Sequence, residues 1–347
     1  MKIPINKLKQ ATLDILDYLG EVPENAEVIA DILIKADMRG VTTHGTYLLK
    51  VMNMRVKAGQ LKLPTLTKVV SDSGATAIID GMDGIGMVAA NKAVELAISK
   101  AKQYGMGIVL VRNTNNIGSL ACYTQKAAEQ GMIAIMSGNA APAMAPFGGA
   151  EQFMGTNPIG ISVASNGVGF TADMASSVVA RGKVRKAARE GVDIPKDWAL
   201  DEDGVSTTDP NKALKGTLLP MGGPKGSALA LTVDILSGIL PGASYAPNLK
   251  SFHVLDGPTG AGVSCIVIDV SRFMELDKFK ELMSGYTDSI KNLKKAKGFS
   301  EILMPGEIEY RKEEESQNNG VTMTEEQIRA LNEILIQADS NIRLESE

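Results

Sequence analysis

The chain has 347 residues, of which 44% are hydrophobic and 22% charged, and its formal net charge is −4. This composition is typical of a globular protein long enough to bury a sizeable core. A weakly acidic chain has no general attraction for nucleic acid or anionic lipid, and no apolar run approaches the roughly 20 residues that span a bilayer. We therefore expect a small-molecule partner, with no nucleic acid and no membrane.

The N-terminal residues MKIPINKLKQ lack the apolar stretch of a signal peptide, which favours a cytoplasmic location. The two cysteines, Cys122 and Cys265, have neither a metal-ligand spacing nor the density of a disulfide framework. Such cysteines are typical of a reducing compartment, and their expected role is core packing. The sequence thus predicts no metal site.

The first region of the chain is predicted to be helical. One helix begins at Pro23, keeps apolar residues on one face and ends at Gly40, and a second covers residues 46–58. The threonines of the segment VTT, residues 41–43, can cap the second helix. His44, one of only two histidines, is therefore expected at the start of that helix.

From about residue 66, short apolar runs alternate with helical patterns, which predicts a mixed α/β (α+β) fold. The predicted strands cover residues 67–72, 76–80, 107–113, 132–138, 159–166, 169–174 and 265–270. The predicted helices cover residues 86–105, 119–131, 179–191, 226–240, 276–298 and 324–339. The strongly polar stretch 311–320 is interpreted as a solvated connection.

A first glycine-rich segment lies between a predicted strand and a predicted helix, where a nucleotide-binding loop belongs. Its glycines, Gly81, Gly84 and Gly86, have the order G-x-x-G-x-G instead of the G-x-G-x-x-G of a Rossmann loop. The next strand ends without an acidic residue that could hold a ribose. We interpret the segment as a plain turn.

A second glycine-rich segment precedes the long apolar helix and contains Gly222, Gly223, Lys225 and Gly226. Exposed N–H groups, the positive end of the helix dipole and a lysine together form an anion site. The spacing is not that of a Walker loop. By itself the segment is equally compatible with a phosphate site and with a simple capped turn.

A third candidate is Asp173, which lies near the end of a predicted strand and is followed by small residues and two serines. A carboxylate there can orient an imidazole or ribose hydroxyls, or it can cap a helix. The irregular loop 138–160 is dense in Gly, Pro, Asn and Ala. Long loops of this kind usually line a site or an interface.

Two further features have plain structural interpretations. Arg181, Arg185 and Arg189 lie at i, i+4 and i+8, which indicates a solvated helix face, with contact to a cofactor phosphate or a subunit as the alternative. His253 has no acidic neighbour at a useful spacing. We interpret it as a structural or surface histidine.

Taken in order, several segments resemble the malate/L-lactate dehydrogenase family, a group of NAD(P)-dependent oxidoreductases outside the Rossmann class. They are RGVTTHG, APFGGAEQFMGTNPIGISV, ADMASSVVARGK, IPKDWALDEDGVSTTDP, LLPMGGPKGSALALTVDILSGILPGA and ILMPGE. Because they span nearly the whole chain in one order, the resemblance is more specific than any single motif.

The resemblance implies a non-Rossmann mixed-sheet dinucleotide-binding fold. A helical domain is expected from residues 1–65 and 308–347, with a mixed α/β cofactor-binding and catalytic domain over residues 66–307, and homodimers are expected. The implied cofactor is NAD or NADP. By similarity its contacts map to Asn139, Ala140, Asp173, Met174, Ala175, Ser176, Lys225, Gly226, Pro305, Gly306 and Glu307.

The resemblance also implies the catalytic residues. His44 matches the family's motif histidine and is expected to give or take the proton that accompanies hydride transfer, because imidazole has a suitable pKa. Asp173 matches the acid that supports this histidine, fixing its tautomer and stabilising the imidazolium. The cofactor carries the hydride, while the protein supplies position and proton handling.

Several pocket positions depart from the family's pattern. Asn116 replaces a second histidine, Leu48 an arginine that can pair with a substrate carboxylate, Met52 a tyrosine, and Ser227 the tyrosine after Lys-Gly. Arg55, further along the same helix face, is predicted to take over anion binding. The predicted substrate pocket comprises Thr43, Leu48, Met52, Arg55, Asn116, Thr156 and Asn157.

The leading hypothesis is an NAD(P)-dependent dehydrogenase or reductase acting on a small 2-oxo/2-hydroxy acid or related compound. One alternative keeps the family and changes the reaction to reduction of a cyclic or acyclic imine, since an iminium already carries the proton that the missing histidine would supply. A second alternative is a dinucleotide-binding protein without catalysis. The motif TTHG and Asp173 argue against this last hypothesis.

Overall fold

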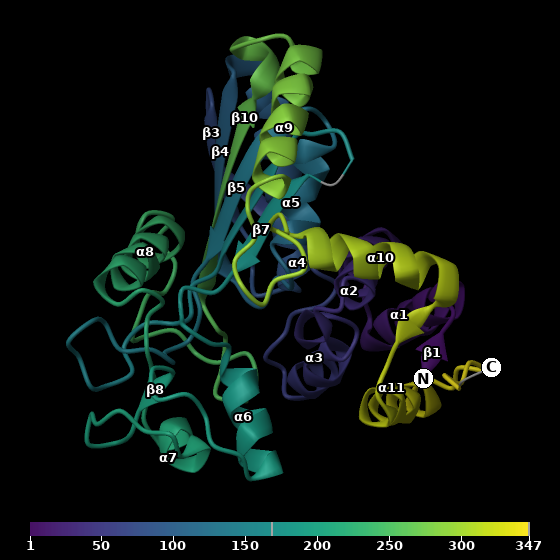
Figure 1. The fold of residues 1–347 in the computed structure, drawn as a ribbon. Coiled ribbons are helices and arrows are strands. Elements are labelled where there is room, and N and C mark those ends of the chain that lie inside the picture. The colour runs from purple at the N-terminus through teal and green to yellow at the C-terminus, as the bar shows by residue number, and fades with distance from the viewer. Residues whose placement is uncertain (168, 346–347) are drawn as a thin grey trace.

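The computed structural model describes residues 1–167 and 169–345, and a seven-stranded sheet forms its centre (Figure 1). The strand order is β2-β3-β4-β10-β5-β6-β7. Their bounds are Lys68–Ser73, Thr76–Asp80, Met106–Thr114, Ala261–Asp269, Met132–Gly138, Ile159–Val163 and Phe170–Met174. The pair β3 and β4 is parallel, and the other neighbouring pairs are antiparallel. The predicted mixed-sheet α/β fold is confirmed.

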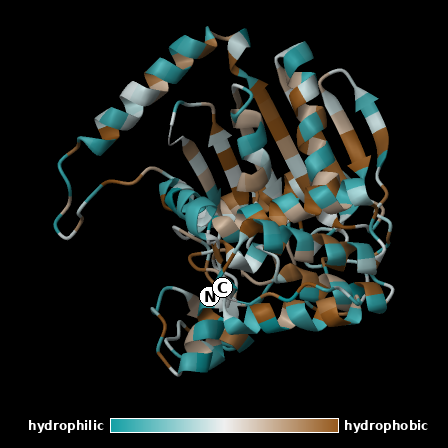
Figure 2. Ribbon diagram, turned by 90° about the vertical axis from the view of Figure 1, so that its right-hand side faces the viewer, coloured by the Kyte–Doolittle hydropathy of each residue, from teal (hydrophilic) through white to brown (hydrophobic). Residues whose placement is uncertain are grey.

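Helices lie on both sides of this sheet. The helices α4 (Gly86–Tyr104) and α5 (Ala121–Ala128) pack against one face, and α8 (Pro224–Asp234) with the π-helical turn Ile235–Ile239 lies on the other (Figure 1). The central strands β4, β5 and β10 are therefore buried, and Figure 2 shows them as brown, apolar ribbons. Continuous apolar runs such as these are expected of strands covered on both faces.

The two ends of the chain meet in a helical unit beside the sheet (Figure 1). It contains α1 (Ile5–Leu19), α2 (Pro23–Met38), α3 (Leu48–Lys57), α10 (Glu307–Asn319) and α11 (Glu325–Gln337). The short strands β1 (Lys2–Ile3) and β11 (Val321–Thr322) pair antiparallel and join the ends. One apolar core runs from these helices into α4 and the sheet, so the predicted domain limits at residues 65 and 308 remain a prediction.

The polar stretch 311–320 is not the solvated connection that its composition predicts, because nearly all of it lies within α10. This helix has no apolar stripe, but Glu313 and Ser316 bond to the end of α2. Tertiary contacts of this kind stabilise a helix that its own sequence would not. The interpretation as a connection is therefore wrong.

A smaller lobe hangs below the sheet in Figure 1. It contains the irregular loop 138–160, the helices α6 (Arg181–Glu190) and α7 (Pro210–Lys215), and the paired strands β8 (Ala199–Leu200) and β9 (Thr217–Leu218). A separate apolar cluster that includes Met144, Met154 and Val184 forms its core. In Figure 1 the lobe and the helical unit thus lie at the same end of the sheet.

The helix α9 (Leu276–Lys291) has no buried residue and extends away from the body of the molecule (Figure 2). Across residues 1–167 and 169–345, no helix combines the length and apolar character needed to cross a bilayer.

Candidate functional site

His44 ends a short 3-10 turn, Thr42–His44, between α2 and α3. Gly40 lies in the left-handed region with φ +73° and ends α2, and the N–H of His44 then bonds the carbonyl of Val41 at 2.9 Å. The side chain of His44 is half-buried. Its Nδ1 lies 2.9 Å from Oγ1 of Thr43, so Nε2 is the nitrogen left for a reacting group.

The threonines before α3 do not cap it as predicted. The N-cap of α3 is Tyr47, with no side-chain hydrogen bond, because Thr43 turns to the imidazole and Thr46 bonds to a carboxylate of α2. The position of His44 thus depends on contacts with α2 more than on helix capping.

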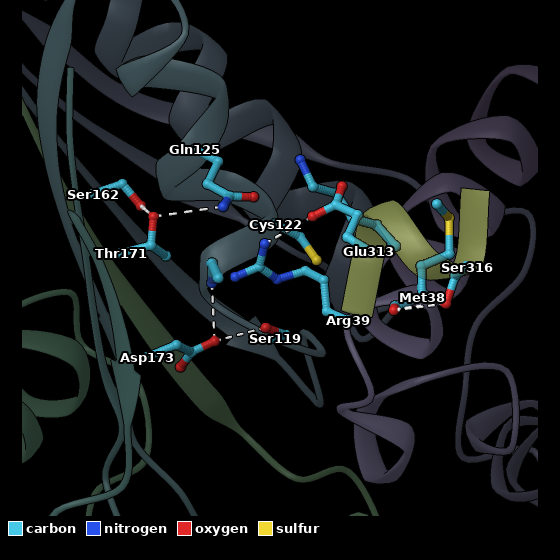
Figure 3. Close-up of polar contacts among 12 residues, drawn as sticks. Met38, Arg39, Ser119, Cys122, Gln125, Ser162, Thr171, Asp173, Glu313 and Ser316 are labelled. Carbon is cyan, nitrogen blue, oxygen red and sulfur yellow. Dashed lines mark hydrogen bonds and ion pairs between the residues drawn. The ribbon is translucent and has the colours of Figure 1, made fainter. Parts of the chain in front are cut away.

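Asp173 lies near the end of β7, and Figure 3 shows it beside Ser119, just before the start of α5. Its Oδ2 accepts hydrogen bonds from Oγ of Ser119 at 2.6 Å and from the N–H of Ala121 at 2.9 Å. Burial lowers the pKa of His44 below the ordinary 6.5, and the charge of Asp173 opposes this change. Asp173 thus acts on His44 through its charge, while the hydrogen-bond partner of Nδ1 is Thr43 instead of the expected Asp173.

The loop after β4 lies directly against His44. A Cβ placed on Gly118 would be 3.6 Å from the carbonyl oxygen of His44, and Oδ1 of Asn116 accepts the N–H of Gly118 at 2.9 Å. The half-buried Asn116 therefore belongs to the same neighbourhood. Three segments far apart in the sequence, carrying His44, Asn116 and Asp173, come together at the junction of the helical unit and the sheet.

Two predicted pocket residues lie in the core instead. Leu48 is 3% exposed and Met52 is fully buried, and both belong to the apolar core of the helical unit. They lie one turn apart on α3, on the face that packs inward. Leu48 and Met52 therefore contribute to the apolar core, and their place in a substrate pocket remains a prediction.

Arg55, predicted to bind an anion, contacts a neighbouring loop in this structure. It is 1% exposed, and its guanidinium donates to the carbonyls of Phe252, Val254 and Gly257 at 3.1, 2.8 and 2.6 Å. It also stacks on the ring of Phe252, with Cζ 5.2 Å from the centroid. The terminal nitrogens of Arg55 thus bond the backbone of the loop 251–257, and its role in anion binding remains a prediction.

The loop that Arg55 holds carries His253, which is exposed. Partial burial lowers the pKa of His253, and the positive charges of Arg185, His44 and Arg55 lower it further. The two histidines are therefore within range of each other's charge. The sequence could not predict that His253 lies near His44. The loop of His253 is held by Arg55, about 200 residues away in the chain, and no residue next to His253 indicates this contact.

The segments predicted to contact a cofactor converge around β7. The N–H of Ala140 bonds Oδ1 of Asn157 at 3.1 Å, and the carbonyl of Asn157 accepts Oγ of Ser176 at 2.6 Å. The N–H of Ser176 bonds the carbonyl of Thr156, and Met221 bonds Ser176 in turn. Loop 138–160, the end of β7 and the start of α8 thus form one continuous scaffold.

Two of these asparagines have structural roles. Asn157 is fully buried and also donates to the carbonyl of Ala230 at 2.8 Å, and its place in the substrate pocket remains a prediction. The side-chain atoms of Asn139 bond Asp234, Ser244 and Gly262. Any contact of Asn139 with a cofactor is therefore limited to its backbone.

The start of α8 keeps the features of an anion site. Gly222 and Gly223 have φ values of +60° and +63°, and nothing lies within 4 Å of a Cβ placed on Gly222. Gly226 packs against the carbonyl of Met221, where a Cβ would be 2.0 Å away, and Lys225 is exposed. Open backbone, first-turn N–H groups and a cation fit a phosphate group of a dinucleotide.

The last predicted cofactor segment runs beside β7. The carbonyl of Pro305 accepts the N–H of Thr171 at 3.0 Å, two residues before Asp173. Glu307 is 3% exposed, and its carboxylate is paired with Lys291 and Arg311 at 2.7 and 2.6 Å. Pro305 and Gly306 therefore remain candidates for a cofactor contact, whereas the carboxylate of Glu307 is already used. Of the two residues that follow Asp173, Met174 is exposed and Ala175 is half-buried.

The glycines of the first glycine-rich segment make a plain turn, as predicted. The N–H of Gly84 bonds the carbonyl of Gly81, and that of Gly86 bonds Oδ1 of Asn115. On α6, Arg181 bonds the carbonyl of Leu214, while Arg185 and Arg189 are exposed. Within the part of the chain that the structure describes, no three His, Cys, Asp or Glu side chains are placed to hold a metal ion.

Comparison with known proteins identifies the family. The sequence model described as malate/L-lactate dehydrogenase matches residues 3–332. The L-sulfolactate dehydrogenase of Methanocaldococcus jannaschii is 43% identical over 87% of this chain and 88% of that protein. The malate dehydrogenase of Pyrococcus horikoshii is 37% identical over 96% and 94%.

A solved structure of a sulfolactate dehydrogenase from Methanocaldococcus jannaschii superposes with a TM-score of 0.94 at 40% identity and covers 99% of this chain and 98% of that one. The chain therefore belongs to the malate/L-lactate dehydrogenase family.

Proposed function

We propose that this member of the malate/L-lactate dehydrogenase family transfers hydride between a nicotinamide cofactor and a small 2-hydroxy or 2-oxo acid, with His44 exchanging the accompanying proton. The observation that carries the proposal is the convergence of His44, the Asn116 loop and Asp173 at one place. The four segments expected to bind the cofactor gather beside it.

The proposed proton transfer follows from the surroundings of His44. Because burial lowers its pKa, the imidazole is neutral at neutral pH and can accept the hydroxyl proton of a substrate at Nε2. The charge of Asp173, held by Ser119 and the N–H of Ala121, favours the imidazolium that forms. In the reverse direction the same imidazolium returns the proton to the reduced carbonyl oxygen.

We propose NAD or NADP as the cofactor, which supplies or accepts the hydride when bound. Two more distant relatives are named as NAD(+)- and NADP(+)-dependent dehydrogenases. The open glycines at the start of α8 and the exposed Lys225 fit a phosphate group of either one.

The names of the relatives point to 2-hydroxy acids with two anionic groups, such as malate and sulfolactate. In this chain Leu48 carries no charge and Arg55 is used by the loop 251–257. The exposed Arg185 lies within charge range of His253, and His253 lies within charge range of His44. We propose that the charge of Arg185 favours the second anionic group of such a substrate and that the neutral imidazole of His253 donates a hydrogen bond to it.

The proposal is tested with purified protein, NADH or NADPH, and a panel containing oxaloacetate, sulfopyruvate, pyruvate and a cyclic imine. Turnover of a dianionic 2-oxo acid is expected, and His44→Gln should reduce kcat by about 10²- to 10⁴-fold. Turnover of the imine alone would assign the reaction to imine reduction. Tight cofactor binding without hydride exchange on any substrate would indicate a binding protein, and full activity of His44→Gln would refute its proton role.

We also propose that the protein works as a homodimer in the cytoplasm. The helix α8 and the following π-helical turn expose four large apolar side chains, those of Leu229, Ile235, Ile239 and Leu240, and subunit contacts often cover apolar side chains of this kind. Light scattering on the purified protein should give twice the chain mass of 36.7 kDa. A monomer at all concentrations would contradict the dimer.

A further inference from the structure

A buried carboxylate lies directly behind the turn that carries His44. Asp37, in the last turn of α2, is 4% exposed. Its Oδ2 accepts the backbone N–H of Thr46 at 2.8 Å and the hydroxyl of Thr46 at 2.7 Å. Its Oδ1 is buried and has no hydrogen-bond partner among the described residues. Asp37 is therefore an ionisable group whose burial is only half compensated.

Folding stability does not explain a carboxylate at this position. Burial raises the pKa of Asp37 from 3.8 to about 6, against the opposing effect of the two bonds from Thr46. Between these values the folded chain binds a proton more tightly than the unfolded chain, so the free energy of unfolding falls as pH rises through this window. At neutral pH the ionised carboxylate therefore adds no stability over a neutral side chain of the same size.

The carboxylate contacts both residues that follow His44. A Cβ placed on Gly45 would lie 1.8 Å from Oδ1 of Asp37, so Oδ1 packs against the backbone of Gly45. This contact is the reason for glycine at position 45. The backbone conformation is not the reason, because any residue can adopt a φ of −93°. Asp37 thus holds Gly45 by packing and Thr46 by two charge-assisted hydrogen bonds.

The end of α2 that carries Asp37 is itself fixed by α10, as Figure 3 shows. Arg39 pairs with Glu313 at 2.8 Å, and Oγ of Ser316 donates to the carbonyl of Met38 at 3.0 Å. The stem of Lys312 packs against Gly40. These are the charged groups beside this end of α2, and none of them donates a hydrogen bond to the carboxylate of Asp37.

On its other side, the turn meets the Asn116 loop, since Gly118 packs against the carbonyl of His44. The turn is therefore held between Asp37 and that loop. We infer that Asp37 is a positioning residue, whose carboxylate sets the place of His44 relative to the reacting atoms through Gly45 and Thr46. The inference rests on the proposed role of His44.

The test compares four variants under saturating cofactor: Asp37→Asn, Thr46→Val, His44→Gln and Thr12→Val. Thr12 is the matched control, because its buried hydroxyl bonds the carbonyl of Leu8 within the same helical unit and away from the turn. A misplaced reacting group slows chemistry without changing ground-state binding. We expect kcat to fall about 10-fold in Asp37→Asn and about 3-fold in Thr46→Val.

KM, cofactor Kd and the free energy of unfolding at neutral pH should change little in Asp37→Asn, and the solvent isotope effect on kcat should rise as proton transfer becomes limiting. A merely structural role would lower stability and leave the isotope effect unchanged, which would overturn the inference. An unchanged kcat in Thr46→Val would also overturn the inference. This second variant provides the test if Asp37→Asn does not fold. Full activity of His44→Gln would refute the proposed function itself, whereas loss in His44→Gln with none in Asp37→Asn refutes only the positioning role.

Discussion

The turn around His44 and the start of α8 are both short connections that precede a helix, yet they are built in opposite ways. The first is held by Asp37 on one side and by Gly118 on the other. The second has two glycines in the left-handed region, open space at Gly222 and an exposed Lys225. The structure thus fixes the proposed proton-transfer group firmly and leaves the proposed phosphate site open.

This difference is what the proposed reaction requires. A group that exchanges a proton has to keep its place within a fraction of an ångström, because misplacement of about 1 Å can cost a large part of the rate. A phosphate, in contrast, is attracted by charge and N–H groups over longer distances. Mutations in the two connections should therefore affect different quantities.

The largest effect is expected from Gly45→Ala. Its Cβ would overlap Oδ1 of Asp37, so the turn has to shift, and we expect kcat to fall about 100-fold with a loss of about 2 kcal/mol in the free energy of unfolding. The control is Gly285→Ala in the middle of α9, where nothing lies within 4 Å and stability should rise slightly. Steady-state kinetics measure kcat, and urea unfolding measures the free energy of unfolding. Equal values for Gly45→Ala and Gly285→Ala would contradict the tight contact at Gly45.

A smaller effect on activity is expected from Arg55→Met. The substitution leaves the carbonyls of Phe252, Val254 and Gly257 without their donor, at a cost of about 3 kcal/mol in the free energy of unfolding. It should also raise KM for a dianionic substrate, because the loop that carries His253 is released. Arg189→Met, on the exposed side of α6, is the control and should stay within about 0.5 kcal/mol of the parent. A stable Arg55→Met variant would show that the loop keeps its shape without the arginine.

The open connection is tested by Lys225→Ala. Loss of this exposed charge should weaken cofactor binding about 10-fold, or about 1.4 kcal/mol, and kcat at saturating cofactor should stay the same. The effect should shrink at high salt, since exposed charges are screened. Lys183→Ala, on the exposed side of α6, serves as the control. Fluorescence titration with NADH measures the affinity, and a drop in kcat instead of affinity would contradict the phosphate role.

The smallest effect concerns pH. Because burial lowers the pKa of His44 below 6.5, the unfolded chain binds this proton more tightly than the folded chain. His44 therefore lowers the free energy of unfolding as pH falls below 6.5, and it has no such effect above that value. For alcohol oxidation, kcat/KM should keep its value to a lower pH than an ordinary histidine allows. His44→Gln should flatten the pH dependence of unfolding, and an acid limb above pH 6.5 would contradict a neutral imidazole.

Several features were predictable from the sequence because they depend on local pattern. The apolar runs at residues 107–113, 132–138 and 265–270 correctly indicated β4, β5 and β10, since strands covered on both faces need apolar residues throughout. The order of glycines at Gly81, Gly84 and Gly86 correctly indicated a turn. The ordered set of motifs identified the family, which the comparisons confirm.

The sequence alone thus determined the fold class and the family, and it placed His44 between the first two helical patterns. Only the tertiary structure decided what the buried polar and boundary residues do. Arg55 serves a distant loop, Asn157 joins two loops, and Asp37 holds the turn of His44. The physical reason is that periodicity shows which face of an element is buried, while a buried polar group is defined by its partner. Those partners lie in segments far away along the chain, where no local pattern can show them.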